Sequence, residues 1–442
     1  MFRSMWCAVA LAVAAFPAQA QDSLREEIKQ LQQRLQQLEK RLQEIDAKAR
    51  KAEDDAARAE NTAAQASARP AGENAFNPAV SLILQGTAAR SSLDPNTYRI
   101  TGFAPPTGEI GPARRGFSLG ESELVITSNI DPYFRGQLVA SLTPEDTVEV
   151  EEAFFQTLGL GRGFTIKGGR FLSSIGYQNQ IHQHAWDFQD APLAYKAFLG
   201  GRLNDDGVQL RWVAPTDLLV ELGTELGQGR TFPGTAPNKN GTGLWTAFAH
   251  IGGDIGTSTA WRTGLSYLRT SPQDRALDDV DALGTQSFTG RSNLWIADFI
   301  LKWAPGGNPT VTNFKLQGEY FRRKEAGALS FDALTGDYAS KQSGWYLQGV
   351  YQFMPQWRVG YRRDQLDHGT VSNGIGLTAA DSPLLLTDYN PKRNTLMVDW
   401  SPSEFSRIRL QLASDRSRFG MTDNQVLLQY IYSLGAHGAH TF

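Results

Sequence analysis

The sequence predicts an all-β transmembrane protein, an antiparallel β-barrel of about sixteen strands preceded by an N-terminal α-helical coiled coil. Three observations predict this class. The chain opens with an export leader, its apolar period changes from about 3.5 residues to 2 near residue 79, and aromatic residues precede short proline turns. The predicted parts are a signal peptide at 1–20, a coiled coil at 21–69, a linker at 70–78 and the barrel at 79–442.

The first twenty residues have the three regions of a signal peptide. Arg3 supplies the positive charge, Met5 to Phe16 form an apolar run, and Ala18-Gln19-Ala20 is a small-residue cleavage site. The run is shorter than the roughly 20 apolar residues of a membrane-spanning helix. The single cysteine, Cys7, lies inside this leader, so the mature chain has no disulfide or thiolate site. An exported, cysteine-free chain indicates the bacterial envelope.

The charge and motif content argue against two classes of function. Lys and Arg number 43 and Asp and Glu 46, a formal net charge of −3, so the chain lacks the basic surface expected of a nucleic-acid-binding protein. It also lacks a GxSxG, HExxH or P-loop pattern, so we expect no enzyme; an outer-membrane hydrolase with a site assembled from separate strands is the alternative.

Residues 21–69 predict a self-associating helix. Apolar residues recur at alternating steps of four and three from Leu24 to Ile45, and alanines continue the register to Ala66. We expect a parallel coiled coil that forms a homotrimer; a single solvated helix is the alternative. Pro70 and Gly72 then end the helix.

The barrel region alternates apolar and polar residues with a period of two. The clearest case is "SRIRLQLAS", in which Ile408, Leu410 and Leu412 alternate with Arg407, Arg409 and Gln411. A soluble sandwich alternates in the same way. Two further features favour a barrel with lipid outside and water inside. One is an aromatic residue before a proline turn, as in "WVAPTDLLV", "KWAPGGNPT", "QFMPQWRVG" and "DWSPSEFSR". The other is a set of long connections at the opposite strand ends, near 172–205, 228–242, 270–290, 326–342 and 367–390.

The last predicted strand also has one apolar face. In "QVLLQYIYSLGAHGAHTF" the residues Val426, Leu428 and Tyr430 form one apolar face, and Phe442 is expected to end the strand in an aromatic girdle. A terminal Phe after an amphipathic strand also resembles the assembly signal of outer-membrane barrels.

The order of these parts, with phrases such as "DWSPSEFSRIRLQ" and "GVQLRWVAP", resembles the phosphate-selective porin O/P family of Gram-negative outer membranes. The resemblance implies a sixteen-stranded barrel, usually trimeric, through which small solutes diffuse. The segments "HQHAWDFQDAPL" and "LGAHGAHTF" are similar to a branch labelled zinc-regulated TonB-dependent receptors.

We therefore expect an outer-membrane porin for passive diffusion of small, including anionic, solutes or ions. Its partners would be outer-membrane lipid, two further copies of the chain and, through the periplasmic coiled coil, peptidoglycan. The alternatives are an outer-membrane zinc uptake protein or receptor, and a barrel that only anchors a tether or adhesin.

Charged residues on the non-aromatic strand faces are predicted to line the pore. They are Arg211, Lys302, Lys315, Arg358, Arg362, Arg407, Arg409, Glu221, Asp298 and Asp399. The arginines could form a basic ladder for anions. Because acidic residues share these faces, a mixed-charge lumen with a transverse field and weak selectivity stays open.

One candidate metal site lies in the longest predicted connection. His182, His184 and Asp187 offer the nitrogen and oxygen ligands that Zn²⁺ or Cu²⁺ accepts, and such a loop can fold into a lumen. Ordinary polar loop residues are the alternative. His437 and His440 are a second, weaker candidate pair, and no other cofactor is expected.

Overall fold

The computed structural model describes residues 29, 33, 78–106, 110–143, 147–234, 240–277, 279 and 281–435. Residues 76–442 form one compact unit. The predicted signal peptide, almost all of the coiled coil and linker, Phe442, His437 and His440 lie outside the described residues. None of the helices in the described part is both long and apolar enough to cross a membrane.

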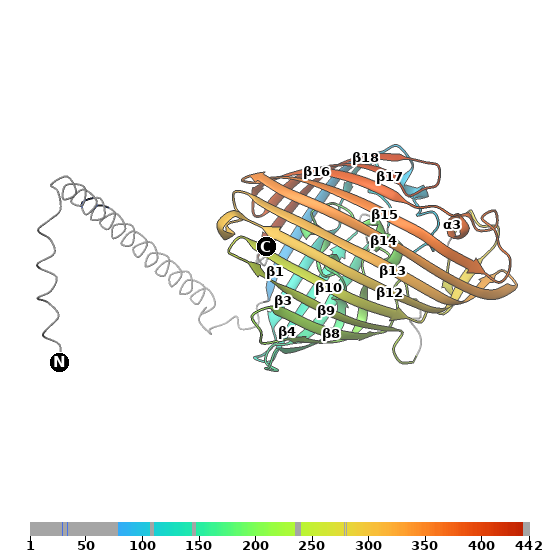
Figure 1. Ribbon diagram of the computed structural model, residues 1–442, viewed down its shortest axis with the longest axis horizontal. Helices are drawn as coiled ribbons and strands as arrows, with labels where there is room; N and C mark the ends of the chain where they lie inside the picture. Colours follow the sequence, from blue (N-terminus) through green and yellow to red (C-terminus); the bar gives the residue numbers. More distant parts are fainter. Residues whose placement is uncertain are drawn as a thin grey trace, which may run out of the picture. The chain divides into compact units, whose positions relative to one another are not determined.

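The unit consists mainly of β-strands (Figure 1). The strands in the first half are β1 (Ala79–Ser91), β2 (Gly116–Leu119), β3 (Ser122–Asn129), β4 (Phe134–Leu142), β5 (Val148–Thr157), β6 (Phe164–Leu172), β7 (Asn204–Val213), β8 (Leu219–Gly227) and β9 (Leu244–Ile255). Those in the second half are β10 (Thr259–Thr270), β11 (Arg275–Ala276), β12 (Gln286–Trp303), β13 (Asn313–Phe331), β14 (Leu334–Met354), β15 (Trp357–Asn373), β16 (Lys392–Ser403), β17 (Ser406–Arg416) and β18 (Asp423–Gly435). The helices are α2 (Leu193–Leu199), α3 (Pro383–Leu386) and the 3₁₀ turns η1 (Pro95–Thr97), η2 (Gln178–Gln180), η3 (Gln183–Ala185) and η4 (Pro305–Gly307).

The strands close into an antiparallel barrel. Each long strand pairs with its sequence neighbour, and β1 pairs with β18 on one side and β3 on the other, which closes the ring. The short strands β2 and β11 continue the positions of β3 and β10 beside β1 and β12. Sixteen of the eighteen described strands therefore make up the wall, which confirms the predicted antiparallel barrel of about sixteen strands. Closure leaves no long strand of the described part at an unpaired sheet edge.

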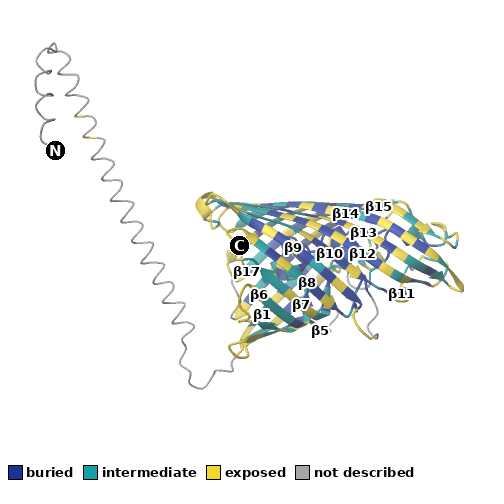
Figure 2. Ribbon diagram, turned by 60° about the horizontal axis from the view of Figure 1, so that its bottom comes forward, coloured by how far each residue is buried: buried dark blue, intermediate teal, exposed yellow. Residues whose placement is uncertain are grey.

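The wall is apolar outside and polar inside. On β17, Leu410 and Leu412 are 44% and 42% exposed, whereas Arg409 and Gln411 between them are 1% and 4% exposed. Figure 2 shows the same alternation of exposed and buried positions along the strands. Successive side chains of a strand point to opposite faces, so one pattern produces both surfaces.

The two ends of the barrel differ in their connections. Pro215, Pro305, Pro355 and Pro402 lie at or beside short connections at one end, as expected from the proline turns. The opposite end carries the long connections 92–115, 173–203, 228–243, 271–285 and 374–391.

The predicted long loop at 326–342 is wrong. Its residues extend β13 and β14, which pair without interruption from Asn313–Gln352 to Phe331–Leu334 around a turn at Asp332 and Ala333. The stretch "AGALSFDALTGDYAS" is rich in small and polar residues, which suggested a loop, but small side chains also allow close strand pairing. The 92–115 connection, in turn, was not foreseen.

The connection between β6 and β7, residues 173–203, lies within the barrel and is called the insert below. Its helix α2 is buried at every position and ends at Gly200, whose φ of 68° suits a C-terminal glycine. Phe198 stacks on the wall residue Phe321 at 6.0 Å between ring centroids. The apolar cluster around it includes Ile175, Trp186, Leu193, Tyr195, Leu199, Leu268, Leu294, Ile296, Tyr346 and Leu366. Burial of each large side chain contributes about 1.5–3 kcal/mol, so the insert packs like a protein core.

Candidate functional site

The insert carries the predicted metal residues and contacts the wall at two groups of charged residues. One group, called the acidic anchor, consists of His182, His184, Glu123, Glu151 and Glu152. The other, called the basic anchor, consists of Asp187 and Asp190 with the cations around them.

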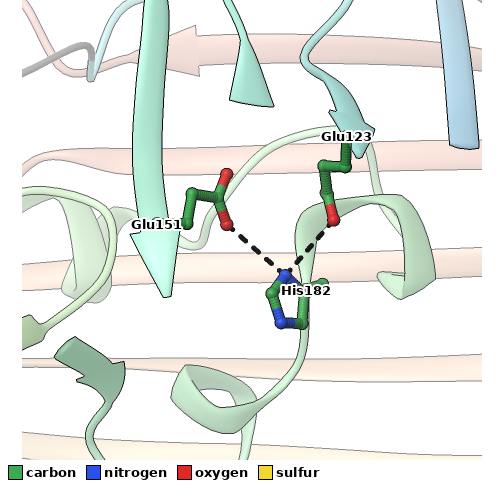
Figure 3. Close-up of side chains that lie close together, drawn as sticks. All are labelled: Glu123, Glu151 and His182. Carbon is green, nitrogen blue, oxygen red and sulfur yellow. Dashed lines mark ion pairs between the residues drawn. The ribbon is translucent and has the colours of Figure 1, made fainter. Parts of the chain in front are cut away.

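Three glutamates of the wall converge on His182 in the acidic anchor. The His182 Nδ1 atom lies 3.3 Å from Glu123 Oε2 and 3.4 Å from Glu151 Oε2, and Figure 3 shows both carboxylates directed at this one nitrogen. The other ring nitrogen, Nε2, is 2.9 Å from Glu152 Oε2. His184 Nδ1 is 2.9 Å from Glu123 Oε1. Each carboxylate is therefore close to at least one imidazole.

A bulge in β5 explains how two consecutive glutamates face inward. The β4–β5 register shifts between Val139 and Ala140, so Glu151 has no partner of its own in the ladder. Glu151 and Glu152 are both 5% exposed. A bulge adds one residue to a strand and interrupts the alternation of faces, so neighbouring side chains can point the same way.

Other groups hold these carboxylates in place. Arg202 donates to both oxygens of Glu151, at 3.2 and 3.1 Å, and Ser141 donates a further hydrogen bond to Glu151. Glu152 Oε1 accepts from the backbone N–H of Leu172 at 3.0 Å. The carboxylates of Glu151 and Glu152 are thus also held by groups other than the insert's histidines.

The charge state of His182 depends on this surrounding. Burial disfavours a charged imidazole, but the carboxylates of Glu123, Glu151 and Glu152 outweigh it and raise the pKa of His182 well above its usual value. Arg202, which pairs with Glu151 at 3.1 Å, is the other positively charged group at these carboxylates.

The basic anchor has the opposite composition. Asp190 pairs with Lys196 at 3.1 Å, with Arg362 at 3.0 Å and with Arg393. All three cations are at most 3% exposed. One carboxylate therefore serves three buried cations.

Asp187 is the second carboxylate of the basic anchor. It pairs with Lys315, with Arg358 at 3.2 Å, and accepts from Gln348 at 3.2 Å. The predicted metal set of His182, His184 and Asp187 is therefore not brought together. The histidines meet glutamates of β3 and β5, whereas Asp187 meets cations of β13 and β15.

Glutamates elsewhere on the inner wall bind the insert's backbone. Glu225 accepts from the N–H of Ser174 at 2.8 Å, and Glu319 accepts from the N–H of Gln178 at 3.0 Å. Both are buried. These two hydrogen bonds attach the first part of the insert to the inner wall, in addition to the two anchors.

The predicted pore-lining residues lie on the inner face, and the contacts of most of them pair opposite charges. Arg358 donates to Asp399 at 2.9 Å, and Arg211 lies 3.3 Å from Glu221. Arg409 donates to the carbonyl of Trp186 at 2.6 Å. Several are almost fully buried, namely Arg362, Arg409, Asp298 and Asp399. The arginines are thus joined to acidic residues and to the insert.

The sequence analysis did not select Glu123, Glu151 or Glu152. Their signal was present in "VEVEEAF", where charged residues occupy consecutive positions of a strand and break the alternation. That break marks a bulge, but not the distant histidines that it faces.

No family model matches the chain. A protein of Aquifex aeolicus (strain VF5), described as uncharacterized, is 32% identical over 400 residues, which cover 84% of this chain and 81% of that protein. Among solved structures, OmpT, an outer membrane protein of Vibrio cholerae in its trimer form, matches with a TM-score of 0.51 at 9% identity over 81% of this chain and 99% of that one. The outer membrane channel DcaP of Acinetobacter baumannii matches with a TM-score of 0.50 at 10% identity over 81% and 97%. The barrel therefore shares the fold of these two outer-membrane proteins.

Proposed function

We propose that this chain, which belongs to the same family as the uncharacterized Aquifex aeolicus protein, is an outer-membrane channel for passive diffusion of small solutes. The observation that carries the proposal is the inside-out barrel: an apolar outer face, and an inner face lined with charged side chains. Such a wall suits lipid outside and water inside. The likeness in fold to DcaP supports the same assignment.

The insert would set the width and the field of this channel. It contacts carboxylates of β3 and β5 at the acidic anchor and cations of β13, β15 and β16 at the basic anchor. Opposite charges on two walls produce a transverse field, which orders polar solutes without strongly preferring one sign. We therefore propose a narrow, weakly selective channel in place of a phosphate-specific one.

Assembly and location complete the proposal. The barrel would lie in the outer membrane, with residues 21–69 in the periplasm forming a trimeric coil close to peptidoglycan. The trimer form of the Vibrio cholerae protein supports a homotrimer. Cross-linking of the full chain against a chain lacking residues 21–69 tests the coil's part in assembly.

Single-channel recording in a planar bilayer tests the channel. We expect stepwise ohmic openings from the wild-type protein, with a reversal potential close to zero in a salt gradient. A variant in which a short Gly-Ser linker replaces residues 179–200 should conduct several-fold more, because the insert no longer crosses the lumen. Folding of both proteins is verified by the heat-dependent mobility shift of barrels on gels. If folded wild-type and linker proteins both pass no current, the channel proposal fails.

A further inference from the structure

We propose that the acidic anchor is a binding site for one divalent transition-metal cation of the zinc class. The ligand atoms are His182 Nδ1, Glu123 Oε2 and Glu151 Oε2, which come from the insert, β3 and β5. The bound ion would hold the insert against this wall.

The spacing of the three atoms fits a shared ion better than direct hydrogen bonds. One ligand atom from each of the three residues lies within 4.8 Å of the others, and His182 Nδ1 is 3.3 and 3.4 Å from the two carboxylate oxygens. Ligands about 2.0–2.1 Å from a tetrahedral zinc ion are separated by about 3.3–3.4 Å. The two separations of 3.3 and 3.4 Å therefore match the edges of a tetrahedron around an ion of this size.

Two of these atoms have no hydrogen-bond partner. Glu123 Oε2 and His182 Nδ1 are both buried and unsatisfied, and Glu123 as a whole is 0% exposed. A buried polar atom without a partner costs roughly 1–3 kcal/mol, and more when charged. A metal cation bound by Glu123 Oε2 and His182 Nδ1 removes this cost, because the lone pair of each atom then coordinates the ion.

The remaining atoms of the same side chains are already engaged in the way a metal site requires. His182 Nε2 lies 2.9 Å from Glu152 Oε2, so an Nε2–H donates there and the Nδ1 lone pair is left for an ion. Metal-bound histidines almost always donate their other N–H to a carboxylate or carbonyl in this manner. Glu123 Oε1 is likewise occupied by His184 at 2.9 Å, which leaves Oε2 for the ion.

The charge around His182 also requires a cation. Three carboxylates contact the ring, and Arg202 pairs with one of them, Glu151, at 3.1 Å. The other two carry their charge in a buried position, which is costly unless it is neutralised. One divalent ion neutralises both.

The donor set selects the class of metal. One imidazole nitrogen and two carboxylate oxygens suit zinc and its first-row neighbours. Calcium takes six to eight oxygens and magnesium an octahedron of oxygens, so neither matches three mixed ligands. The side chain of His182 is 19% exposed, so an ion can reach the site from the lumen and a water can complete its coordination.

Zinc binding to the purified full-length protein in detergent tests the site. The protein is stripped with a chelator, mixed with ZnCl₂ alone, desalted, and its zinc measured by mass spectrometry. We expect one zinc per chain beyond any bound elsewhere. His182→Ala and Glu123→Gln should each lower the affinity at least about tenfold, since even outer neighbours of metal ligands cost 10- to 100-fold.

Two matched controls locate the ion. His250→Gln removes another buried histidine that faces a carboxylate, Glu221 at 2.8 Å, and should leave zinc binding unchanged. The double variant His437→Ala/His440→Ala removes the C-terminal pair and should retain one zinc per chain. If the wild-type protein binds no zinc at micromolar concentration, or His182→Ala and Glu123→Gln both bind it as tightly as wild type, the site is refuted.

Cobalt provides a second readout that does not depend on variants. Co²⁺ bound in a four-coordinate nitrogen–oxygen site absorbs visible light much more strongly than six-coordinate aqueous Co²⁺. We expect the strong bands in the wild-type protein and in His250→Gln, and their loss when Zn²⁺ is added. Weak, six-coordinate bands in wild type would overturn the tetrahedral site. None of these measurements depends on whether the barrel conducts.

Discussion

The two anchors hold the same segment but with opposite excesses of charge. At the basic anchor, Asp190 is shared by Lys196, Arg362 and Arg393. At the acidic anchor, three carboxylates surround His182, and Arg202 compensates one of them. The comparison teaches that two equally buried groups of charges can differ in how completely their charges are compensated. At the basic anchor the chain itself supplies both signs of charge, with cations in excess. At the acidic anchor carboxylates are in excess, so a further positive charge would be favourable there.

Removing the shared carboxylate should have the largest effect. Asp190→Ala leaves three buried cations without their common partner, and such a change costs about 3–5 kcal/mol. Denaturant unfolding in detergent, followed by tryptophan fluorescence, measures the loss. Asp388→Ala is the control, since Asp388 is 92% exposed and its loss should stay within about 0.5 kcal/mol. A loss below about 1 kcal/mol for Asp190→Ala would show that the basic anchor does not hold the insert.

Neutralising a carboxylate at the acidic anchor should cost less. In chelator-containing buffer, Glu123→Gln weakens the hydrogen bond from His184 but relieves repulsion from Glu151 and Glu152, so we expect a loss of no more than about 2 kcal/mol. The same unfolding titration measures it beside Asp190→Ala. Equal losses for the two variants would contradict the asymmetry between the anchors.

An exposed ion pair should matter less than either anchor. Asp206 binds Arg170 at 2.6 and 3.1 Å, but its side chain is 44% exposed. Asp206→Asn should therefore change the free energy of unfolding by less than about 1 kcal/mol. A larger loss would mean that burial is not what separates the anchors from other charged pairs of the wall.

The smallest expected effect is on ion selectivity. Arg407→Ala removes one cation near the basic anchor and should shift the permeability ratio toward cations by about twofold, which corresponds to about 0.4 kcal/mol. Arg363→Ala, whose side chain bonds Asn394 at 2.8 Å on the outer face, is the control. Reversal potentials in a salt gradient measure both. A shift toward anions in Arg407→Ala would contradict a transverse field from this wall.

The local sequence was sufficient for most of the wall of the barrel, but not for the ends of β13 and β14 at residues 326–342. Alternation such as that of Leu410 and Leu412 with Arg409 and Gln411 predicted which side chains face outward, because a strand places successive residues on opposite faces. Proline after an aromatic residue marked the short turns, because proline lacks the N–H that continued strand pairing requires. The sequence also indicated a long connection that carries two histidines, and that such a connection can fold into the lumen.

Only the tertiary structure decided what the insert touches. Glu123 and His182 are 59 residues apart, and Asp190 and Arg393 are 203 apart, so their pairing depends on ring closure and on the path of the insert. The bulge that turns both Glu151 and Glu152 inward depends on the neighbouring strand β4. Alternation is a property of one strand and can be predicted from its residues, but a site assembled from β3, β5 and a long connection is set by packing between segments that the sequence separates.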